Sequence, residues 1–376
     1  MNQNFDFRVS IGFGDLINLV IHHRASCLPV VMDGIPAEMI SPVPFSGLPE
    51  EVDEKPVSMS GVVYLTRGVS SGFAKALVMG GESPVLDFEK AKGEHDAFVK
   101  TLKQRGGPLV SVVEIEADKD QPDCVFVEDC LVALPGRGLL QCAPCDSRLG
   151  EVEPVSKAAQ NIEFQFPPGK VEIDYITDPS DGSRIEGGDV LYVKGGDDVY
   201  HHYFVGVGNR SNALGAESLR KALRNSLKRC TSKKLPNDAD ESQLFKVHEI
   251  DLSVDSSWLH LKSAVTWAPY VGFVASSDTC PIFQEMKKVC EAFEQTTTNL
   301  IHDEKPVVVP RHSTNVLPLP GGIVFVHPDA VTSIKEKGGS QVEIISVDQP
   351  ELAKADGALT CGVLVLDPFF EWTGFS

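Results

Sequence analysis

The stretch "GGDVLYVKGG" (residues 187–196), followed by "YHHYFVGVGNRSN" (residues 200–212), contains the unit from which this chain is built. Each half is a short apolar run rich in β-branched and aromatic residues, and glycines separate the two halves. Two such runs across a glycine turn are typical of a β-hairpin. Acidic residues, Glu186 and Asp189, lie at the edge of the first run, so we expect a hairpin with a charged end.

Similar strand-like pieces recur on both sides of this hairpin. They are "GVVYLTRG" at Gly61, "CVFVEDCLVAL" at Cys124, "HLKSAVTWAPYVGFVASS" at His260, "TNVLPLPGGIVFVH" at Thr314 and "LTCGVLVLD" at Leu359. Helical patterns occur between them, over residues 85–106, 215–230 and 280–296. A spacing of roughly 50 to 65 residues indicates a repeat. The pattern predicts an α/β fold whose units close on one another, so that their loops meet in one shared cleft near the axis.

Composition limits the classes of partner. The 376 residues carry 53 acidic and 34 basic side chains, with a formal net charge of −19. Nucleic-acid binding depends on Lys and Arg that neutralise phosphates, so we expect no nucleic-acid partner and a small cationic ligand instead. No apolar run is long enough to span a membrane. Nine irregularly spaced cysteines without a secretory signal indicate a cytoplasmic protein, while the oligomeric state stays open.

The two ends of the chain differ from the repeats. Residues 1–60 are irregular and proline-rich, and they end near the acidic stretch "PEEVDEK". We interpret them as an N-terminal extension and linker. The segment "GDLINLVIHH" (residues 14–23) is predicted as an amphipathic helix or a strand of that extension. Residues 368–376 are predicted to form a C-terminal tail.

Three acid-bearing patches stand at the edges of apolar strands. They contain Asp123, Glu128 and Asp129; Glu186 and Asp189; and Asp356, which precedes Cys361 by five residues. Burying a carboxylate without a partner is costly, so these acids require a cation. Salt bridges or turn-forming acids would explain any one patch alone. Three patches together with a cysteine favour a cationic ligand.

A thiol and an imidazole accompany the acids. Cys361 opens an apolar run, and His260 lies between two leucines on a strand-like stretch. Each alone is commonly a packing residue, but together with an acid on another strand they form a candidate for nucleophilic catalysis. Arg148 and Arg210 are either solvated loop charges or a clamp for an amino-acid carboxylate. Cys142 and Cys145 have CxxC spacing without a second pair, so their function stays open.

The motifs "PDCVFVED", "GGDVL" with "VGVGNRSN", "LHLKS" and "DGALTC", in this order, resemble those of the dimethylarginine dimethylaminohydrolases. These enzymes belong to the superfamily of guanidino-group modifying enzymes, and the similarity runs over residues 61–367. The resemblance implies a five-bladed α/β propeller of ββαβ modules, the pentein fold. It also implies hydrolysis of N-methylated L-arginine to L-citrulline and methylamine or dimethylamine, through a covalent cysteine thiouronium intermediate and without a metal or organic cofactor.

The resemblance also assigns roles to residues. It makes Cys361 the nucleophile, His260 the general acid and base, and Glu186 the acid that partners the histidine. The substrate-binding residues that it implies are Asp123, Glu128, Asp129, Asp356, Arg148, Arg210 and, on the lid, Leu77.

Two departures from the family pattern are Gly362, where animal members have a second cysteine, and the loop "CAPCDSR" before Arg148. Arginine deiminase, amidinotransferase and non-catalytic guanidinium binding remain as alternatives.

Overall fold

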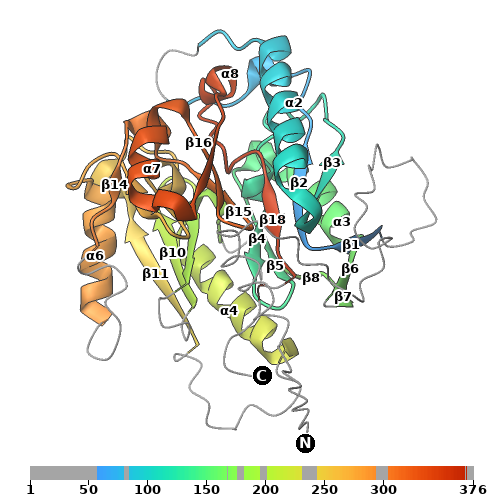
Figure 1. Ribbon diagram of the computed structural model, residues 1–376. Coiled ribbons are helices and arrows are strands. Elements are labelled where there is room, and N and C mark those ends of the chain that lie inside the picture. Colours follow the sequence, from blue (N-terminus) through green and yellow to red (C-terminus); the bar gives the residue numbers. More distant parts are fainter. Residues whose placement is uncertain are drawn as a thin grey trace, which may run out of the picture.

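The computed structural model describes residues 57–79, 84–166, 168–175, 182–194, 201–230, 244–293, 304–368 and 370. These residues form an α/β fold of small three-stranded sheets with helices outside them (Figure 1). The segment 14–23 and most of the predicted N-terminal extension lie outside the described residues. The hairpin pattern and the three predicted helical segments are confirmed.

The hairpin at residues 187–212 belongs to a ββαβ module. Strand β9 (Val190–Lys194) pairs antiparallel with β10 (His201–Val207), and β10 pairs parallel with β11 (Phe245–Asp251). Helix α4 (Ala213–Cys230) makes the crossover between the two parallel strands, as parallel pairing requires. The central strand β10 is buried over most of its length, which explains its continuous apolar run.

Three further modules within the described residues repeat this order of antiparallel strand, central strand, helix and parallel strand. One consists of β4 (Leu131–Leu134), β5 (Gly138–Gln141), α3 (Val152–Gln160) and β8 (Glu172–Tyr175). The next consists of β12 (Val265–Ala268), β13 (Gly272–Ala275), α6 (Pro281–Phe293) and β14 (Val307–Val308). The third consists of β15 (Leu317–Leu319), β16 (Ile323–Val326), α7 (Val331–Gly338) and β17 (Glu343–Ser346).

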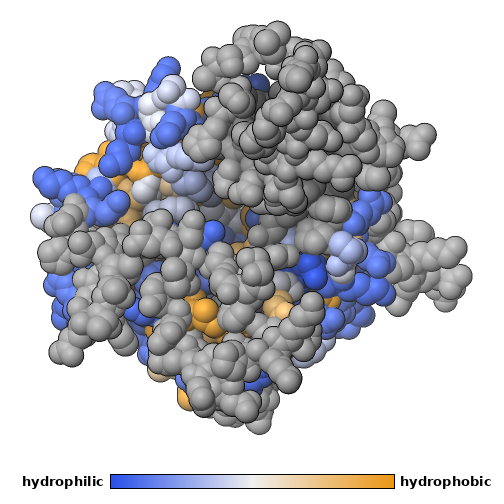
Figure 2. Space-filling model, turned by 60° about the horizontal axis from the view of Figure 1, so that its bottom comes forward, coloured by the Kyte–Doolittle hydropathy of each residue, from blue (hydrophilic) through white to orange (hydrophobic). Residues whose placement is uncertain are grey.

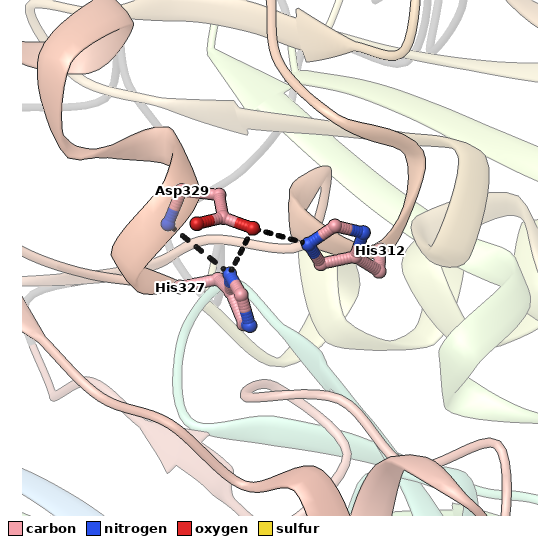
Figure 3. Close-up of side chains that lie close together, drawn as sticks. All are labelled: His312, His327 and Asp329. Atoms are coloured by element: carbon pink, nitrogen blue, oxygen red, sulfur yellow. Dashed lines mark hydrogen bonds and ion pairs between the residues drawn. The ribbon is translucent and has the colours of Figure 1, made fainter.

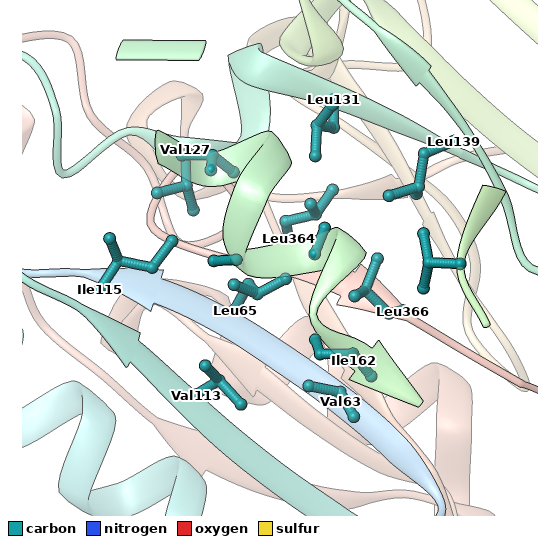
Figure 4. Close-up of a cluster of buried hydrophobic side chains, with 14 of the residues drawn as sticks. Val63, Leu65, Val113, Ile115, Val127, Leu131, Leu139, Ile162, Leu364 and Leu366 are labelled. Carbon is teal, nitrogen blue, oxygen red and sulfur yellow. The ribbon is translucent and has the colours of Figure 1, made fainter. Parts of the chain in front are cut away.

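A fifth module joins the two ends of the repeat region. Strand β2 (Val62–Arg67) pairs parallel with β3 (Val110–Ile115) across helix α2 (Phe88–Arg105), and its antiparallel neighbour is β18 (Leu364–Leu366). Leu364 and Leu366 pack with Val63 and Leu65 in one buried cluster (Figure 4). The strand nearest the C-terminus therefore completes the module that begins the repeat region.

A sixth sheet stands apart from the repeat. It contains β1 (Val57–Ser60), β6 (Ile162–Phe166) and β7 (Pro168–Lys170), with β1 parallel to β6. Strand β1 lies within the segment predicted as linker, and the ring of Phe370, in the predicted tail, lies 4.6 Å from that of Tyr192. The division at residues 60 and 367 otherwise stays a prediction.

Local sequence accounts for the longest helices and the loops. The Asp87 side chain caps α2 by accepting the Lys90 N–H at 3.2 Å, and Phe98 and Leu102 form part of its buried face. Two one-turn helices, α5 (Leu261–Ala264) and α8 (Pro350–Ala353), lie in loops. The prediction of a strand at His260 is wrong: His260 is the N-cap residue of α5, and the strand begins at Val265.

Polar side chains dominate the described surface. On the face in Figure 2, hydrophilic residues occupy most of the described rim, and hydrophobic residues emerge in smaller patches. Among the helices described, none combines the length and the apolar character needed to cross a bilayer.

Candidate active site

The loops at one edge of the modules line a pocket that is open to solvent. Its lining comes from two kinds of loop, those that enter the antiparallel strand of a module and those that leave its central strand. Both kinds lie at the same edge because the two strands run in opposite directions. The lining residues are Leu77, Asp123, Phe126, Asp129, Arg148, Arg210, Leu259, His260, Ala355, Asp356 and Cys361. The structure therefore brings most of the predicted site residues together.

Two predicted residues, Glu186 and Glu128, do not line the pocket but support residues that do. Glu186 is fully buried, and its Oε2 lies 2.6 Å from Nε2 of His260. Glu128 accepts hydrogen bonds from Lys262 at 2.6 Å and from the Thr360 hydroxyl at 2.8 Å. Glu128 thus connects the loop of His260 with the loop of Cys361.

The imidazole of His260 is fixed on several sides. A Cβ added to Gly188 would lie 2.7 Å from Nδ1 of His260, so only glycine allows the ring to pack there. The next backbone N–H, of Leu261, donates to Asp189 at 3.0 Å. Burial opposes a charge on the ring, but Asp129, Asp189 and Glu186 outweigh it and raise the pKa of His260 to about 9. His260 is therefore an imidazolium at neutral pH.

Arg148 lies in a buried ion cluster. Its Nη1 donates to Asp129 at 2.7 Å, its Nη2 donates to Glu151 at 2.8 Å, and it also donates to the carbonyl of Phe126 at 3.1 Å. Burial disfavours the charged form of Asp129, yet His260 and Arg148 lower its pKa to about 2. The sequence analysis did not identify Glu151 as a partner of Arg148. Glu151 lies three residues after Arg148, and this spacing places opposite charges on the same face of a helix.

Cys361 is buried in the turn three residues before β18, 7% exposed, and it lines the same pocket as His260. Its carbonyl accepts the N–H of Glu128 at 3.2 Å. Burial, reinforced by the nearby carboxylates of Glu128 and Asp129, raises the pKa of the Cys361 thiol well above its ordinary value. Without a cation in the pocket the sulfur is therefore a thiol.

The segment carrying Leu77 lies over two of the acids. The N–H of Leu77 donates to Asp123 at 3.0 Å, and the N–H of Met79 donates to Asp356 at 2.5 Å. Burial raises the pKa of both carboxyls. Leu77 is 38% exposed, so its side chain stands at the boundary between pocket and solvent, as expected for a lid residue.

Arg210 lies near Oε1 of Glu186, the carboxylate oxygen that does not contact His260. Its Nη1 lies 3.5 Å from Oε1 of Glu186 and 3.2 Å from Sγ of Cys145. The Arg210 side chain is 18% exposed, more than that of Arg148. Of the two cysteines with CxxC spacing, Cys142 is buried, Cys145 is half-buried, and both are free thiols. Cys145 therefore contacts Arg210, a residue of the pocket lining, without lining the pocket itself.

Asn315 is a further residue that the sequence analysis missed. Its amide donates to the Thr360 hydroxyl at 3.0 Å and to the carbonyl of Lys262 at 3.2 Å, and its oxygen accepts the Thr360 N–H at 2.9 Å. The signal was positional: Asn315 precedes β15 as His260 precedes β12 and Cys361 precedes β18.

Asp129, Glu186 and His260 each place a potential metal-ligand atom within 4.8 Å of the others. Both oxygens of Asp129 are already occupied, by Arg148 at 2.7 Å and by the N–H of Gly188 at 2.9 Å. The positive charge of protonated His260 is already stabilised by Asp129 and Glu186, the same carboxylates that would have to bind a metal ion. We assign no metal to this group.

Comparison with known proteins gives several relatives. No protein-family model matches the chain. It is 26% identical to an N(G),N(G)-dimethylarginine dimethylaminohydrolase of Streptomyces coelicolor over 79% of this chain and 94% of the relative. It is also 26% identical to the enzyme of that name from Pseudomonas aeruginosa, over 77% of this chain and 94% of the relative. These matches confirm the resemblance drawn from the motifs.

Solved structures share the α/β fold. A dimethylarginine dimethylaminohydrolase adduct with S-methyl-L-thiocitrulline matches with a TM-score of 0.58 and 22% identity, covering 82% of this chain and all of the other. The Pseudomonas aeruginosa enzyme, as a variant complexed with citrulline, matches with a TM-score of 0.58 and 21% identity over the same shares of the two chains. The N-terminal domain of ArgZ, a cyanobacterial arginine dihydrolase, matches with a TM-score of 0.55 and 14% identity, over 82% of this chain and 98% of the other.

Proposed function

We propose that this chain is a hydrolase of the dimethylarginine dimethylaminohydrolase type, which converts N-methylated L-arginine to L-citrulline and methylamine or dimethylamine. One observation carries the proposal: Cys361 and the His260 imidazole, held by Glu186 at 2.6 Å, line a single pocket with the carboxylates of Asp123, Asp129 and Asp356. The Streptomyces and Pseudomonas relatives of this name support it.

In the proposed complex the acids hold the substrate cation. Asp123 and Asp356 bracket the planar guanidinium, and Asp129, whose oxygens already accept from Arg148 and Gly188, adds its negative charge from the same pocket. Glu128 supports the nucleophile loop from behind. Arg210 and Arg148 face the amino-acid end. Because Arg148 already donates to Asp129 and Glu151, we assign the carboxylate clamp mainly to Arg210. Leu77 covers the bound substrate.

The proposed reaction begins when the substrate cation enters and lowers the pKa of the Cys361 thiol, which loses its proton to solvent. The thiolate attacks the central guanidinium carbon. The imidazolium of His260 gives its proton to the departing nitrogen, and the amine leaves a covalent thiouronium. Neutral His260 then takes a proton from water, whose oxygen attacks the same carbon. Collapse releases the ureido product, citrulline, and the Cys361 thiolate, and the hydroxyl proton passes to the sulfur, which restores the thiol.

A second candidate is hydrolysis of unmethylated arginine to citrulline and ammonia. The arginine dihydrolase domain with a similar fold favours it, because the same thiol, imidazole and acids suit both substrates. The size of the space around the departing nitrogen decides between the two. Amidinotransfer requires an amine acceptor in place of water, and non-catalytic binding would leave the guanidinium intact.

We also infer that the five ββαβ modules close radially into a five-bladed propeller with the pocket at its axis. The pairing of β18 with β2 supports closure, since it joins the last strand to the first module. In this arrangement residues 61–367 are the catalytic domain, preceded by an extension and followed by a short tail.

A citrulline assay tests the function directly. The full chain is incubated with asymmetric dimethylarginine, monomethylarginine, arginine, and arginine plus an amine acceptor. We expect citrulline from the methylated substrates and none from the Cys361→Ser variant, whose alcohol is a much weaker nucleophile than a thiolate. Preference for unmethylated arginine would select the second candidate. Normal turnover by Cys361→Ser, with its fold verified by circular dichroism, would disprove the cysteine mechanism.

A further inference from the structure

We propose that His312, His327 and Asp329 form a binding site for a divalent transition metal such as Zn²⁺, separate from the active site. His312 lies in the turn Arg311–Ser313, between β14 and β15, and His327 directly follows β16. Asp329 lies in the turn Pro328–Ala330. Figure 3 shows the three side chains turned toward one another.

The location follows from the repeat. In the other modules, pocket residues come from a loop that enters the antiparallel strand, as His260 does, or from a loop that leaves the central strand, as Arg210 does. In the module of β15, β16 and β17 the corresponding loops carry His312 and His327. The same topology that assembles the active site therefore also brings these two imidazoles together.

The distances suit a metal ion. His312 Nε2 lies 2.8 Å and His327 Nδ1 lies 3.9 Å from the same oxygen, Oδ2 of Asp329. All three ligand atoms lie within 4.8 Å of one another. Around tetrahedral zinc, with bonds of about 2.0 to 2.1 Å, neighbouring ligand atoms are roughly 3.3 Å apart. The two distances to Asp329 therefore each differ from this spacing by about half an ångström.

A second carboxylate orients His327. Oδ1 of Asp348 lies 3.5 Å from Nε2 of His327, on the opposite side of the ring from Asp329. Metal-binding histidines usually direct their other ring nitrogen at a carboxylate, which fixes the tautomer. Here the proton belongs on Nε2, and Nδ1 presents its lone pair to the cluster. Nδ1 now accepts from the Ser313 hydroxyl at 3.0 Å and the Asp329 N–H at 3.2 Å, which a metal bond would replace.

The donor set selects the kind of metal. Two imidazoles and a carboxylate suit Zn²⁺, Co²⁺, Ni²⁺ or Cu²⁺, whereas Mg²⁺ and Ca²⁺ prefer oxygen ligands alone. The side chains of His312 and Asp329 are 57% and 55% exposed, so water has access to the remaining coordination positions. An ion there would fasten the segment between β14 and β15 to the end of β16. The competing interpretation is a pair of surface His–Asp contacts without metal.

Cobalt titration of the metal-free full chain under reducing conditions tests the site, because Co²⁺ reports its ligands by optical absorption. We expect the absorption spectrum to contain visible bands of Co²⁺ bound by nitrogen and oxygen ligands. The Co²⁺ that gives these bands should not show the near-ultraviolet absorption of thiolate ligands, and we call this signal the cobalt component. In the Asp329→Asn and His312→Ala variants, the Co²⁺ affinity measured from this component falls about tenfold or more. Asp278→Asn, an equal charge change on an exposed loop, leaves it unchanged.

The outcome is independent of catalysis. Both site variants retain citrulline formation, since neither residue lines the pocket. Loss of the cobalt component in Asp329→Asn and His312→Ala, with circular dichroism unchanged, supports the site. Unaltered cobalt affinity in either variant, or cobalt absorption of the thiolate type alone, overturns it. Zn²⁺ competition against the bound Co²⁺ then tests the metal named here.

Discussion

At the scale of single residues, the pocket keeps both the Cys361 thiol and the His260 imidazole in their protonated forms. Burial and the nearby acids raise the pKa of Cys361, and the same acids overcome burial to raise the pKa of His260 to about 9. The resting pair is thus a thiol beside an imidazolium. A guanidinium cation would lower the thiol pKa while leaving the imidazolium able to protonate a departing amine.

Replacing Glu186 by Gln tests this balance. Glu186 raises the pKa of His260 both by hydrogen bonding and by its charge. In the Glu186→Gln variant, the imidazole of His260 should therefore titrate at lower pH. Histidine-labelled protein followed by NMR measures that pKa directly. A raised pKa keeps His260 protonated at lower pH, and the proton is lost as pH rises through about 9 in the wild type. At pH 8 we therefore expect kcat to fall about tenfold for each unit by which the pKa drops below 8.

The control for this variant is Glu153→Gln, which replaces an exposed carboxylate on α3 that pairs with the surface residue Lys157. It should change neither the His260 titration nor kcat. An unaltered His260 titration in Glu186→Gln would show that Glu186 does not set the proton affinity of the imidazole.

At the scale of elements, the residues to which we assign catalysis and substrate binding occupy the loops that precede antiparallel strands. Asp129 precedes β4, Glu186 precedes β9, His260 precedes β12 and Cys361 precedes β18. The sequence analysis placed these acids and the thiol at strand edges correctly, because a charged residue next to an apolar run is visible in the sequence. It missed Asn315, before β15, because a neutral amide carries no such signal.

We predict that Asn315→Ala lowers kcat about 10- to 100-fold with a smaller effect on KM. The amide joins the loops of His260 and Cys361, and its loss removes the acceptor of the buried Thr360 N–H, at a cost of about 1–3 kcal/mol. Asn315 does not line the pocket, so it acts as a positioning residue. Steady-state kinetics with dimethylarginine gives the two constants separately.

Asn225→Ala, the same change on the exposed face of α4, serves as the matched control. A loss of stability in Asn315→Ala with kcat unchanged would reduce Asn315 to a purely structural role.

At the scale of the whole molecule, the strand nearest the C-terminus and the strand that begins the repeat region share one sheet. Leu364 is 4% exposed and lies opposite Leu65 in the register of β18 and β2. Cys361 lies three residues before this strand, so the position of the proposed nucleophile depends on the pairing that joins distant parts of the chain. The described fold is therefore coupled to its chemistry through β18.

Truncating Leu364 to Ala should lower the free energy of unfolding by about 2–5 kcal/mol, because it leaves a cavity in a packed cluster. Urea unfolding followed by circular dichroism measures the change. Val308→Ala removes a hydrophobic side chain that is 43% exposed and should stay within about 0.5 kcal/mol of wild type. Equal effects of the two substitutions would argue that β18 is not part of the cooperative core.

The sequence by itself determined the repeat of hairpins and helices, the strands at whose edges the acids stand, and the resemblance to a guanidino-modifying family. These properties depend on residues close together in the chain, where hydrophobic periodicity and turn residues are direct signals. The sequence-based prediction of a strand at His260 was wrong. His260 is held as the N-cap residue of α5 by groups from other loops, namely Gly188, against which the ring packs, and the acids Asp129, Asp189 and Glu186. These contacts are not visible in the residues next to His260 in the chain.

Only the tertiary structure decided which charges pair. It joined Arg148 to Asp129 and Glu151, and it placed Glu186 behind the imidazole rather than in the pocket. It also brought His312 and His327 together beside Asp329. The energy of a charge depends on burial and on partners within a few ångströms, and neither quantity can be read from positions along the chain when the partners are separated by tens or hundreds of residues.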